Sequence, residues 1–262
     1  MFRLSLIVHR AVVRVLAIVA TLFVCVGTSP SAWAEELTVS AAASLTDAFR
    51  EIGKAFEAGK PGTRIIFNFG ASGPLLQQIA QGAPVDVFAS ADQETKDRAA
   101  AKALIVADSR MVFANNQLVL AIPAGAALVP IFLNDLTASG YRRIAIGSPA
   151  SVPAGRYARE ATDAAGLTEA LQDRFIYADS VRQVLAYVAR AEVDAGFVYR
   201  TDALIDKERV KIALELPTRT PVSYPVAQVA TTKRPALSRE FIAYLRTAPA
   251  QAVLTRFGFR KP

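Results

Sequence analysis

Between residues 37 and 56 the pattern of apolar positions changes its period once. A short apolar run at 37–39 predicts a strand, and the apolar positions of 45–56 then recur at the spacing of an amphipathic helix. Ser44 lies at this change, and Ser44 together with Asp47 fits the capping box that opens many helices. A strand that feeds such a helix leaves N–H groups and a hydroxyl facing one point, which is a ready anion site. A plain helix cap is the alternative interpretation of Ser44.

The same alternation of strand and helix recurs along the chain. Strands are predicted at 64–69, 85–89, 117–122, 143–147, 175–178, 195–199, 210–216 and 224–230, and helices at 75–81, 93–103, 156–165, 181–191, 237–246 and 250–257. Strand followed by helix is typical of a parallel sheet covered on both faces. The stretch 128–133 is apolar but fits neither period. Two α/β units without a low-complexity linker predict two lobes joined by strands, with a cleft between them.

The first 34 residues have the organisation of a signal peptide. Three arginines lie within residues 3–14, an apolar run follows at 15–26, and Ala32-Trp33-Ala34 is an A-x-A cleavage site. The apolar run is shorter than the roughly 20 residues of a membrane span. Lipid attachment at Cys25 is an alternative, which the large Val24 before it disfavours. We therefore expect export to the periplasm and cleavage after residue 34.

The composition of the mature chain excludes several classes of function. Removal of the leader's three arginines lowers the net charge from +7 to +4, and the remaining basic residues are scattered, so nucleic acid is not an expected partner. The single Cys, His and Trp (Cys25, His9 and Trp33) all lie in the leader. Ser-His-Asp and Cys-His nucleophiles and His/Cys zinc sites are therefore excluded. An exported hydrolase that uses carboxylates, and a structural or adhesive domain, stay open as alternatives.

Five points along the chain share one physical character. Four are strand-to-helix junctions, at Ser44, Ser72, 153–155 and 180–181, and the fifth is the strand end at 196–199. Ligands of open α/β sheets bind beyond the carboxyl ends of the strands, where helix N-termini offer N–H donors. No Asp or Glu stands out among the five points. A site of donors alone suits an anion without a proton, such as molybdate, tungstate or sulfate, whereas phosphate needs an acceptor as well.

Eight stretches, taken in this order and spacing, resemble the periplasmic molybdate-binding proteins of bacterial ABC importers. The resemblance covers essentially the whole mature chain. The stretches are AAASLTDAF (41–49), FGASGPLLQQI (69–79), GAPVDVFASADQ (82–93), VPAGRYAREA (152–161), DSVRQVLAYV (179–188), GFVYRTDA (196–203), YPVA (224–227) and FGF (257–259).

The resemblance implies the α/β periplasmic binding protein fold, in which two α/β lobes joined by hinge crossovers close on the ligand. Residues 1–34 are then the signal peptide, lobe 1 is discontinuous (35–115 and 225–262), and lobe 2 spans 116–224. The chain would cross between the lobes near Asn116 and return near Tyr224.

The resemblance also implies the ligand contacts. Ser44 and Ser72 bind through hydroxyl and backbone N–H, Ala154 and Val181 through backbone N–H, and Tyr199 through its hydroxyl. Molybdenum is then held only as the oxyanion, without protein atoms on the metal and without a resident cofactor. The implied function is high-affinity binding of molybdate and tungstate by a monomer that delivers them to an inner-membrane permease. A binding protein for sulfate or another tetrahedral oxyanion is the alternative.

Three arginines, Arg156, Arg182 and Arg200, lie close in sequence to these positions. One interpretation is that they are solvated or steer the anion at long range. The other is a direct ion pair with the anion, for which the resemblance gives no support.

Overall fold

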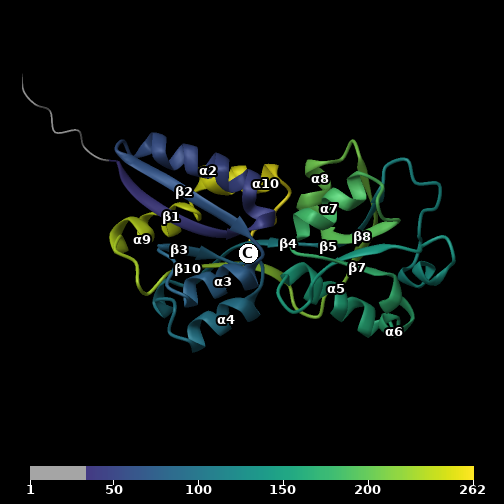
Figure 1. Cartoon of the computed structure of the whole chain (residues 1–262). Coiled ribbons are helices and arrows are strands. Elements are labelled where there is room, and N and C mark those ends of the chain that lie inside the picture. The colour runs from purple at the N-terminus through teal and green to yellow at the C-terminus, as the bar shows by residue number, and fades with distance from the viewer. Residues whose placement is uncertain (1–33) are drawn as a thin grey trace, which may run out of the picture. The chain divides into compact units, whose positions relative to one another are not determined.

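The computed structural model describes residues 34–262, so the predicted signal peptide, apart from its last residue, lies outside the described residues. Residues 36–262 form two sheets, each with helices packed against it, which is the expected two-lobe α/β fold (Figure 1). We refer to the first sheet and its helices as lobe 1 and to the second sheet and its helices as lobe 2. Among residues 34–262 no helix is both long and apolar enough to cross a membrane.

Lobe 1 is built on a sheet that, within the described residues, has five strands in the order β2-β1-β3-β10-β4. These strands are β1 (Glu35–Ala42), β2 (Thr63–Gly70), β3 (Val87–Ala89), β4 (Met111–Asn116) and β10 (Val222–Gln228). Its helices are α2 (Thr46–Gly59), α3 (Ser72–Ala80), α4 (Gln93–Ala101), α9 (Pro235–Tyr244) and α10 (Ala248–Arg256). β1 and β3 are parallel, but β10 is antiparallel to both β3 and β4, so the sheet is mixed rather than purely parallel.

Lobe 2 repeats this plan between residues 118 and 216. Its sheet has the order β7-β6-β8-β5-β9 in the part of the chain that the structure describes. The strands are β5 (Leu118–Pro123), β6 (Ile144–Gly147), β7 (Phe175–Ala178), β8 (Ala195–Tyr199) and β9 (Val210–Leu216). The helices are α5 (Pro153–Ala164), α6 (Thr168–Leu171), α7 (Val181–Ala189) and α8 (Arg200–Ile205). β6 is parallel to β7 and β8, whereas β5 is antiparallel to β8 and β9.

Strands of the two sheets follow one another at two places in the chain. β4 of the first sheet is separated from β5 of the second by Gln117 alone, and β9 leads back to β10. The residues near which the chain was expected to cross between the lobes, Asn116 and Tyr224, therefore lie in β4 and β10. The exact lobe boundaries stay a prediction. The sequence pattern did not indicate β4, because a single residue between two strands leaves no turn signal to separate them.

Two helices begin earlier than their apolar periodicity predicts. α3 begins at Ser72 rather than at residue 75. α5 begins at Pro153 rather than near Arg156. Proline at the first position starts α5 without apolar periodicity. The start of α3 has neither a side-chain cap nor a proline at its first position, so no local signal marked it. The residues around Ser72 and 153–155 consequently lie inside first turns and not in the loops before them.

The apolar stretch 128–133 is neither helix nor strand. Leu128, Ile131 and Phe132 are 54%, 72% and 70% exposed. Asp135 Oδ2 accepts the backbone N–H groups of Ile131 and Phe132 at 2.8 and 2.9 Å, and these bonds lower the pKa of Asp135. A carboxylate that receives two backbone donors therefore fixes the end of this loop at the start of the 3₁₀ turn Leu133–Thr137.

Candidate functional site

Ser44 lies in a 3₁₀ turn, Ala43–Leu45, that joins β1 to α2. The capping box predicted for Ser44 and Asp47 is wrong, since Leu45 occupies the position before α2 and no side chain caps the helix. The hydroxyl of Ser44 instead lies 2.9 Å from the hydroxyl of Tyr224 on β10. The extra turn moves Ser44 out of capping geometry, so its buried hydroxyl is not used by the helix that follows.

Ser72 is the first residue of α3 and is fully buried. Its Oγ accepts the backbone N–H of Ala91 at 3.1 Å. One acceptor position of this hydroxyl is therefore occupied by the protein, and its own proton is available as a donor.

Ala154 and Val181 lie in the first turns of α5 and α7, where backbone N–H groups have no acceptor inside the helix. Ser180 caps α7, because its Oγ accepts the N–H of Gln183 at 3.2 Å. Both helices follow strands of the second sheet and present the positive ends of their dipoles at the same edge.

Tyr199 ends β8 and is 1% exposed. Its hydroxyl lies 3.5 Å from the carbonyl oxygen of Ala91, a long contact for a hydrogen bond. Burial, followed by the neighbouring Tyr224 and Tyr157, raises the pKa of Tyr199 well above its usual value. The hydroxyl therefore keeps its proton at neutral pH and can act only as a neutral donor or acceptor.

The structure brings all five predicted residues into one pocket between strand ends and helix starts. The cavity has a volume of about 10 Å³, and Ser44 and Ser72 of lobe 1 line it together with Ala154, Val181 and Tyr199 of lobe 2. Its other lining residues are small or apolar, namely Ala42, Ala43, Gly70, Ala71, Ala91, Val152 and Pro153. Pockets for drug-sized molecules occupy about 300–1,000 Å³, so this one suits a smaller ligand.

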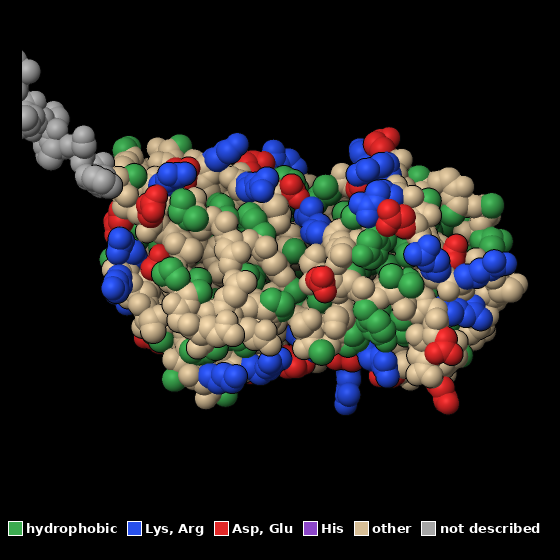
Figure 2. All heavy atoms as spheres, in the orientation of Figure 1, with side chains coloured by type: hydrophobic (Ala, Val, Ile, Leu, Met, Phe, Trp, Pro, Cys, Tyr) green, Lys and Arg blue, Asp and Glu red, His purple; other side chains and the backbone are tan. Residues whose placement is uncertain are grey.

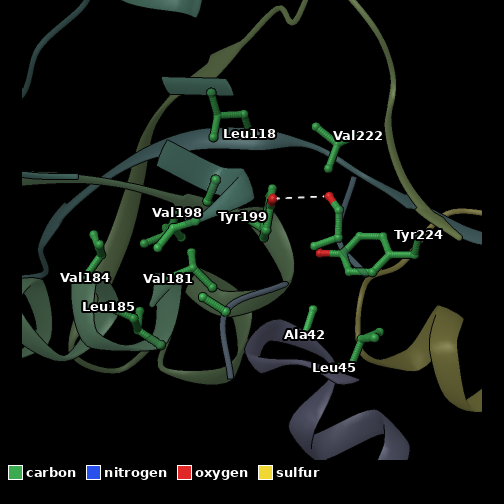
Figure 3. Close-up of a cluster of buried hydrophobic side chains, with 14 of the residues drawn as sticks. Ala42, Leu45, Leu118, Val181, Val184, Leu185, Val198, Tyr199, Val222 and Tyr224 are labelled. Atoms are coloured by element: carbon green, nitrogen blue, oxygen red, sulfur yellow. Dashed lines mark hydrogen bonds between the residues drawn. The ribbon is translucent and has the colours of Figure 1, made fainter. Parts of the chain in front are cut away.

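Buried side chains from both lobes surround the pocket. In Figure 3, Val181 and Tyr199 of lobe 2 face Ala42, Leu45 and Tyr224 of lobe 1. None of the residues that line the pocket carries a formal charge. The chemistry offered there is a set of neutral N–H and O–H donors.

Arg156 is an ion-pair partner within the protein, which corrects the interpretation that it is solvated. Its side chain is 14% exposed, and its Nε lies 3.1 Å from Asp92 Oδ2 and 3.2 Å from Glu94 Oε2. Arg156 belongs to α5 of lobe 2, whereas Asp92 and Glu94 belong to lobe 1, at the start of α4. The arginine therefore joins the two lobes.

Arg182 makes a second connection of this kind. Its Nη2 lies 2.7 Å from Asp47 Oδ2 of lobe 1, and its Nε lies 2.7 Å from the buried Asp202 Oδ1 of lobe 2. Burial alone would lower the pKa of Arg182, but the attraction of Asp202 and Asp47 outweighs burial and raises this pKa above its usual value. The guanidinium therefore stays charged. Two carboxylates beside one guanidinium leave little positive charge for an anion in the pocket.

Arg200 differs from these two arginines. Its side chain is 37% exposed and pairs with the exposed Glu215 at 3.3 Å. The interpretation of a solvated residue fits Arg200 alone. On the face shown in Figure 2, Lys and Arg side chains are interspersed with Asp and Glu and do not form one basic patch.

Gly73 allows the two lobes to approach within backbone contact. Its N–H donates to the carbonyl oxygen of Ser151 at 3.0 Å. A Cβ at Gly73 would lie 2.5 Å from that oxygen and 2.9 Å from Ser151 Cα. Glycine is required here because backbone atoms, unlike the end of a flexible side chain, cannot move aside.

Sequence reasoning missed two residues that bear on the site, Asn116 and Tyr224, except as markers of the hinge. Tyr224 contacts Ser44 across 180 positions of sequence. β10 is buried throughout and also contains the polar residues Ser223 and Gln228, so the hydroxyl of Tyr224 did not stand out as a signal.

Comparisons with known proteins agree with the two-lobe fold. A family described as bacterial extracellular solute-binding protein matches residues 37–260. The molybdate-binding protein ModA of Haemophilus influenzae is 37% identical over 232 residues, which cover 86% of this chain and 89% of that protein. A putative ABC transporter substrate-binding lipoprotein, YvgL of Bacillus subtilis, is 38% identical, with 85% of each chain covered. The solved periplasmic molybdate-binding protein of Azotobacter vinelandii has a TM-score of 0.76 at 26% identity, covering 86% of this chain and 99% of that one.

The contact at Gly73 generates a first prediction. Gly73→Ala should weaken binding of the expected oxyanion, molybdate, by about tenfold or more, because an added Cβ holds the lobes apart and at least one charge-assisted hydrogen bond is lost. Isothermal titration calorimetry measures this. Gly59→Ala is the matched control, since a Cβ there meets no atom within 4 Å. Equal affinities of the two variants would show that the lobes do not close through this contact.

The ion pair of Arg182 with Asp47 generates a second prediction. Asp47→Asn should lower the affinity for molybdate about two- to fivefold, because a partly exposed pair contributes about 0.5–1 kcal/mol to the closed arrangement. Titration calorimetry of Glu215→Gln, which removes the exposed pair within lobe 2, is the control and should show wild-type affinity. An unchanged affinity of Asp47→Asn would mean that this pair does not favour closure.

This chain therefore belongs to the bacterial extracellular solute-binding proteins, as the family match over residues 37–260, the two relatives of 37% and 38% identity and the two-lobe fold show.

Proposed function

We propose that this protein binds molybdate and tungstate in the pocket between its lobes and delivers them to the permease of an ABC importer in the inner membrane. The family it belongs to consists of solute-binding proteins and not of enzymes, so the alternative of an exported hydrolase is set aside. We further propose that the protein acts in the periplasm after its signal peptide has been removed, and that it acts as a monomer.

One observation carries the proposal: the pocket offers donors without a charged acceptor. Ser44, Ser72 and Tyr199 supply hydroxyls, and Ala154 and Val181 supply backbone N–H groups of first helical turns. An oxygen-rich dianion accepts such hydrogen bonds at every oxygen, and those bonds are stronger than bonds between neutral groups. The relatives named as molybdate-binding proteins support molybdate among the dianions of this shape.

The proposed role needs no resident cofactor. The transported molybdenum enters as an oxyanion whose oxygens, and not the metal, contact the protein. Within residues 34–262 no group of three or more His, Cys, Asp or Glu side chains could hold a metal ion directly.

Thermal unfolding with different anions tests the proposal. A ligand that binds only the folded protein raises Tm, so molybdate and tungstate should each give a large and similar increase. Sulfate has shorter bonds and leaves donors out of reach, each worth about 1.5–3 kcal/mol, so two lost contacts weaken binding about a hundredfold or more. Sulfate and phosphate should therefore change Tm very little. An equal response to sulfate would support the sulfate-binding alternative, and no response to any anion would contradict oxyanion binding.

Variants of the site sharpen the same measurement. Ser44→Ala, Ser72→Ala and Tyr199→Phe should each reduce the molybdate-dependent increase in Tm, measured from the Tm of the same variant without ligand. Ser44→Ala and Ser72→Ala should also lower the Tm of the free protein, because each removes the partner of a buried polar group. Ser238→Ala is the control, because Ser238 of α9 is equally buried but donates to the carbonyl oxygen of Arg234, the residue before α9, away from the pocket. A normal response in all three site variants would place the ligand elsewhere.

A further inference from the structure

Lys96 is a fully buried lysine in the core of lobe 1. It lies in α4, its side chain is 0% exposed, and its Nζ donates to the carbonyl oxygen of Phe88 at 2.6 Å. The same Nζ lies 3.8 Å from the centre of the Phe88 ring. Among the described residues no carboxylate lies within salt-bridge distance of this nitrogen. A charged ammonium has three N–H donors, so one oxygen and one ring face stabilise its charge poorly.

Few charged groups act on Lys96 from the elements around it. β3, α3 and β10 carry no charged side chain, and the other charged side chains of α4 are exposed, namely Glu94, Asp97 and Arg98. Burial lowers the pKa of Lys96 well below its usual value, Arg110 lowers this pKa further, and Asp92 raises it only in part. The carboxylate of Asp92 is itself bound by Arg156 of lobe 2. The protein without ligand therefore holds a proton on Lys96 only weakly.

Lys96 lies behind the wall that lobe 1 contributes to the pocket. Phe88, whose carbonyl oxygen it binds, is three residues before Ala91, and Ala91 lines the pocket. Three residues of extended chain span at most about 10–11 Å. Residues 88–91 are all buried, so protein and not water separates the lysine from the pocket. A ligand in the pocket and the Nζ of Lys96 are therefore on the order of 10 Å apart.

A dianion at this distance favours the protonated lysine. Through a protein interior, the attraction between two negative charges and one positive charge about 10 Å apart changes an equilibrium constant about tenfold or more. Arg156 acts in the opposite direction, because its approach to Asp92 cancels the negative charge nearest to Lys96. The arginine brings one charge and the ligand brings two, so the ligand determines the direction of the change.

We propose that Lys96 takes up a proton when the oxyanion binds, so that a buried cation of lobe 1 compensates part of the ligand's charge behind the neutral lining of the pocket. The proton passes from the solvent to Nζ, and no bond of the anion changes. Lys96 does not touch the ligand and acts through its charge alone. The inference rests on the proposed function, because the charge that it compensates is that of the dianion in the same pocket.

The composition of the chain makes such a proton easy to assign. His and Cys are the side chains whose reference pKa values lie between about 6 and 9, and residues 34–262 contain neither. After removal of the signal peptide, the α-amino group is the other group with a reference pKa in this range. Proton uptake between these pH values therefore comes from Lys96 or from the α-amino group.

Calorimetric titration with molybdate measures the uptake directly. At each pH from about 6 to about 9 the titration is repeated in buffers of different ionisation enthalpy, and the dependence of the observed heat on the buffer gives the number of protons taken up. We expect uptake of up to one proton per molybdate. Because the complex holds more protons than the free protein, the affinity should fall about tenfold or more as the pH rises through the range of uptake.

Lys96→Met removes the charge and keeps an unbranched side chain that suits apolar surroundings. This variant should bind molybdate without proton uptake, and its affinity should not change over the same pH range. Lys54→Met is the matched control, because Lys54 is an exposed lysine of α2 in the same lobe, and it should keep the uptake of the wild type. Acetylation of the α-amino group should likewise keep the uptake, which assigns the proton even if Lys96→Met does not fold.

The outcomes separate this inference from the proposed function. Molybdate binding without proton uptake at any pH overturns the inference and leaves the proposed function standing. Proton release would show that the approach of Arg156 outweighs the ligand and overturns it as well, as does equal uptake in the wild type and in Lys96→Met. If the wild type gives no heat of binding with molybdate, the proposed function is wrong and the inference falls with it.

Discussion

A dianion that leaves water must find a hydrogen-bond donor for each of its oxygens, and the pocket depends on this requirement above all. In the site that we propose, the chain meets it without using charged side chains, because buried strands from both lobes end at helix starts there. Backbone N–H groups in first helical turns lack partners inside the helix, and serine or tyrosine hydroxyls stand beside them. Because these donors belong to rigid elements, they are oriented before the ligand arrives. The small, uncharged lining of the pocket is the structural consequence.

Arg156 and Arg182 connect the two lobes in this structure, whereas Arg200 pairs within lobe 2. Arg156 pairs with Asp92 and Glu94, and Arg182 pairs with Asp47. Each of these two arginines of lobe 2 therefore contacts a carboxylate of lobe 1. A neutralised pair adds little field inside the pocket but favours the arrangement in which the lobes touch. Attraction between lobes and recognition of the anion are thus carried by different residues, and a single charge substitution affects one without removing the other.

The sequence predicted most of the architecture because strand and helix periods are local properties. The α/β class, the two lobes and the grouping of Ser72, Tyr199 and the first turns of α5 and α7 follow from apolar patterns and from resemblance. β4 escaped this reasoning because Gln117 alone separates it from β5. The turn at Ser44 was misread as a capping box, since the same residue types suit a cap and a 3₁₀ turn.

Contacts between distant residues could not be predicted at all. The Ser44–Tyr224 hydrogen bond joins positions 180 residues apart, and the Arg182–Asp47 pair joins positions 135 apart. Nothing in the local pattern of either partner indicates the other, because the meeting is decided by the topology of the sheets and by closure of the lobes. The partners of the hydroxyls in the pocket are set by such contacts and so became visible only with the structure.

The most direct test of recognition by neutral donors is the dissociation constant of molybdate, measured by titration calorimetry as the salt concentration rises from about 0.01 M to about 1 M. Over this range the Debye length falls from about 30 Å to about 3 Å, which removes most of the attraction between exposed charges. Hydrogen bonds from buried neutral groups are screened far less. We expect one site per protein with an affinity that changes little over the whole range. A steep, linear fall of log affinity with log salt would instead show that Arg156 and Arg182 leave their carboxylates and bind the anion themselves.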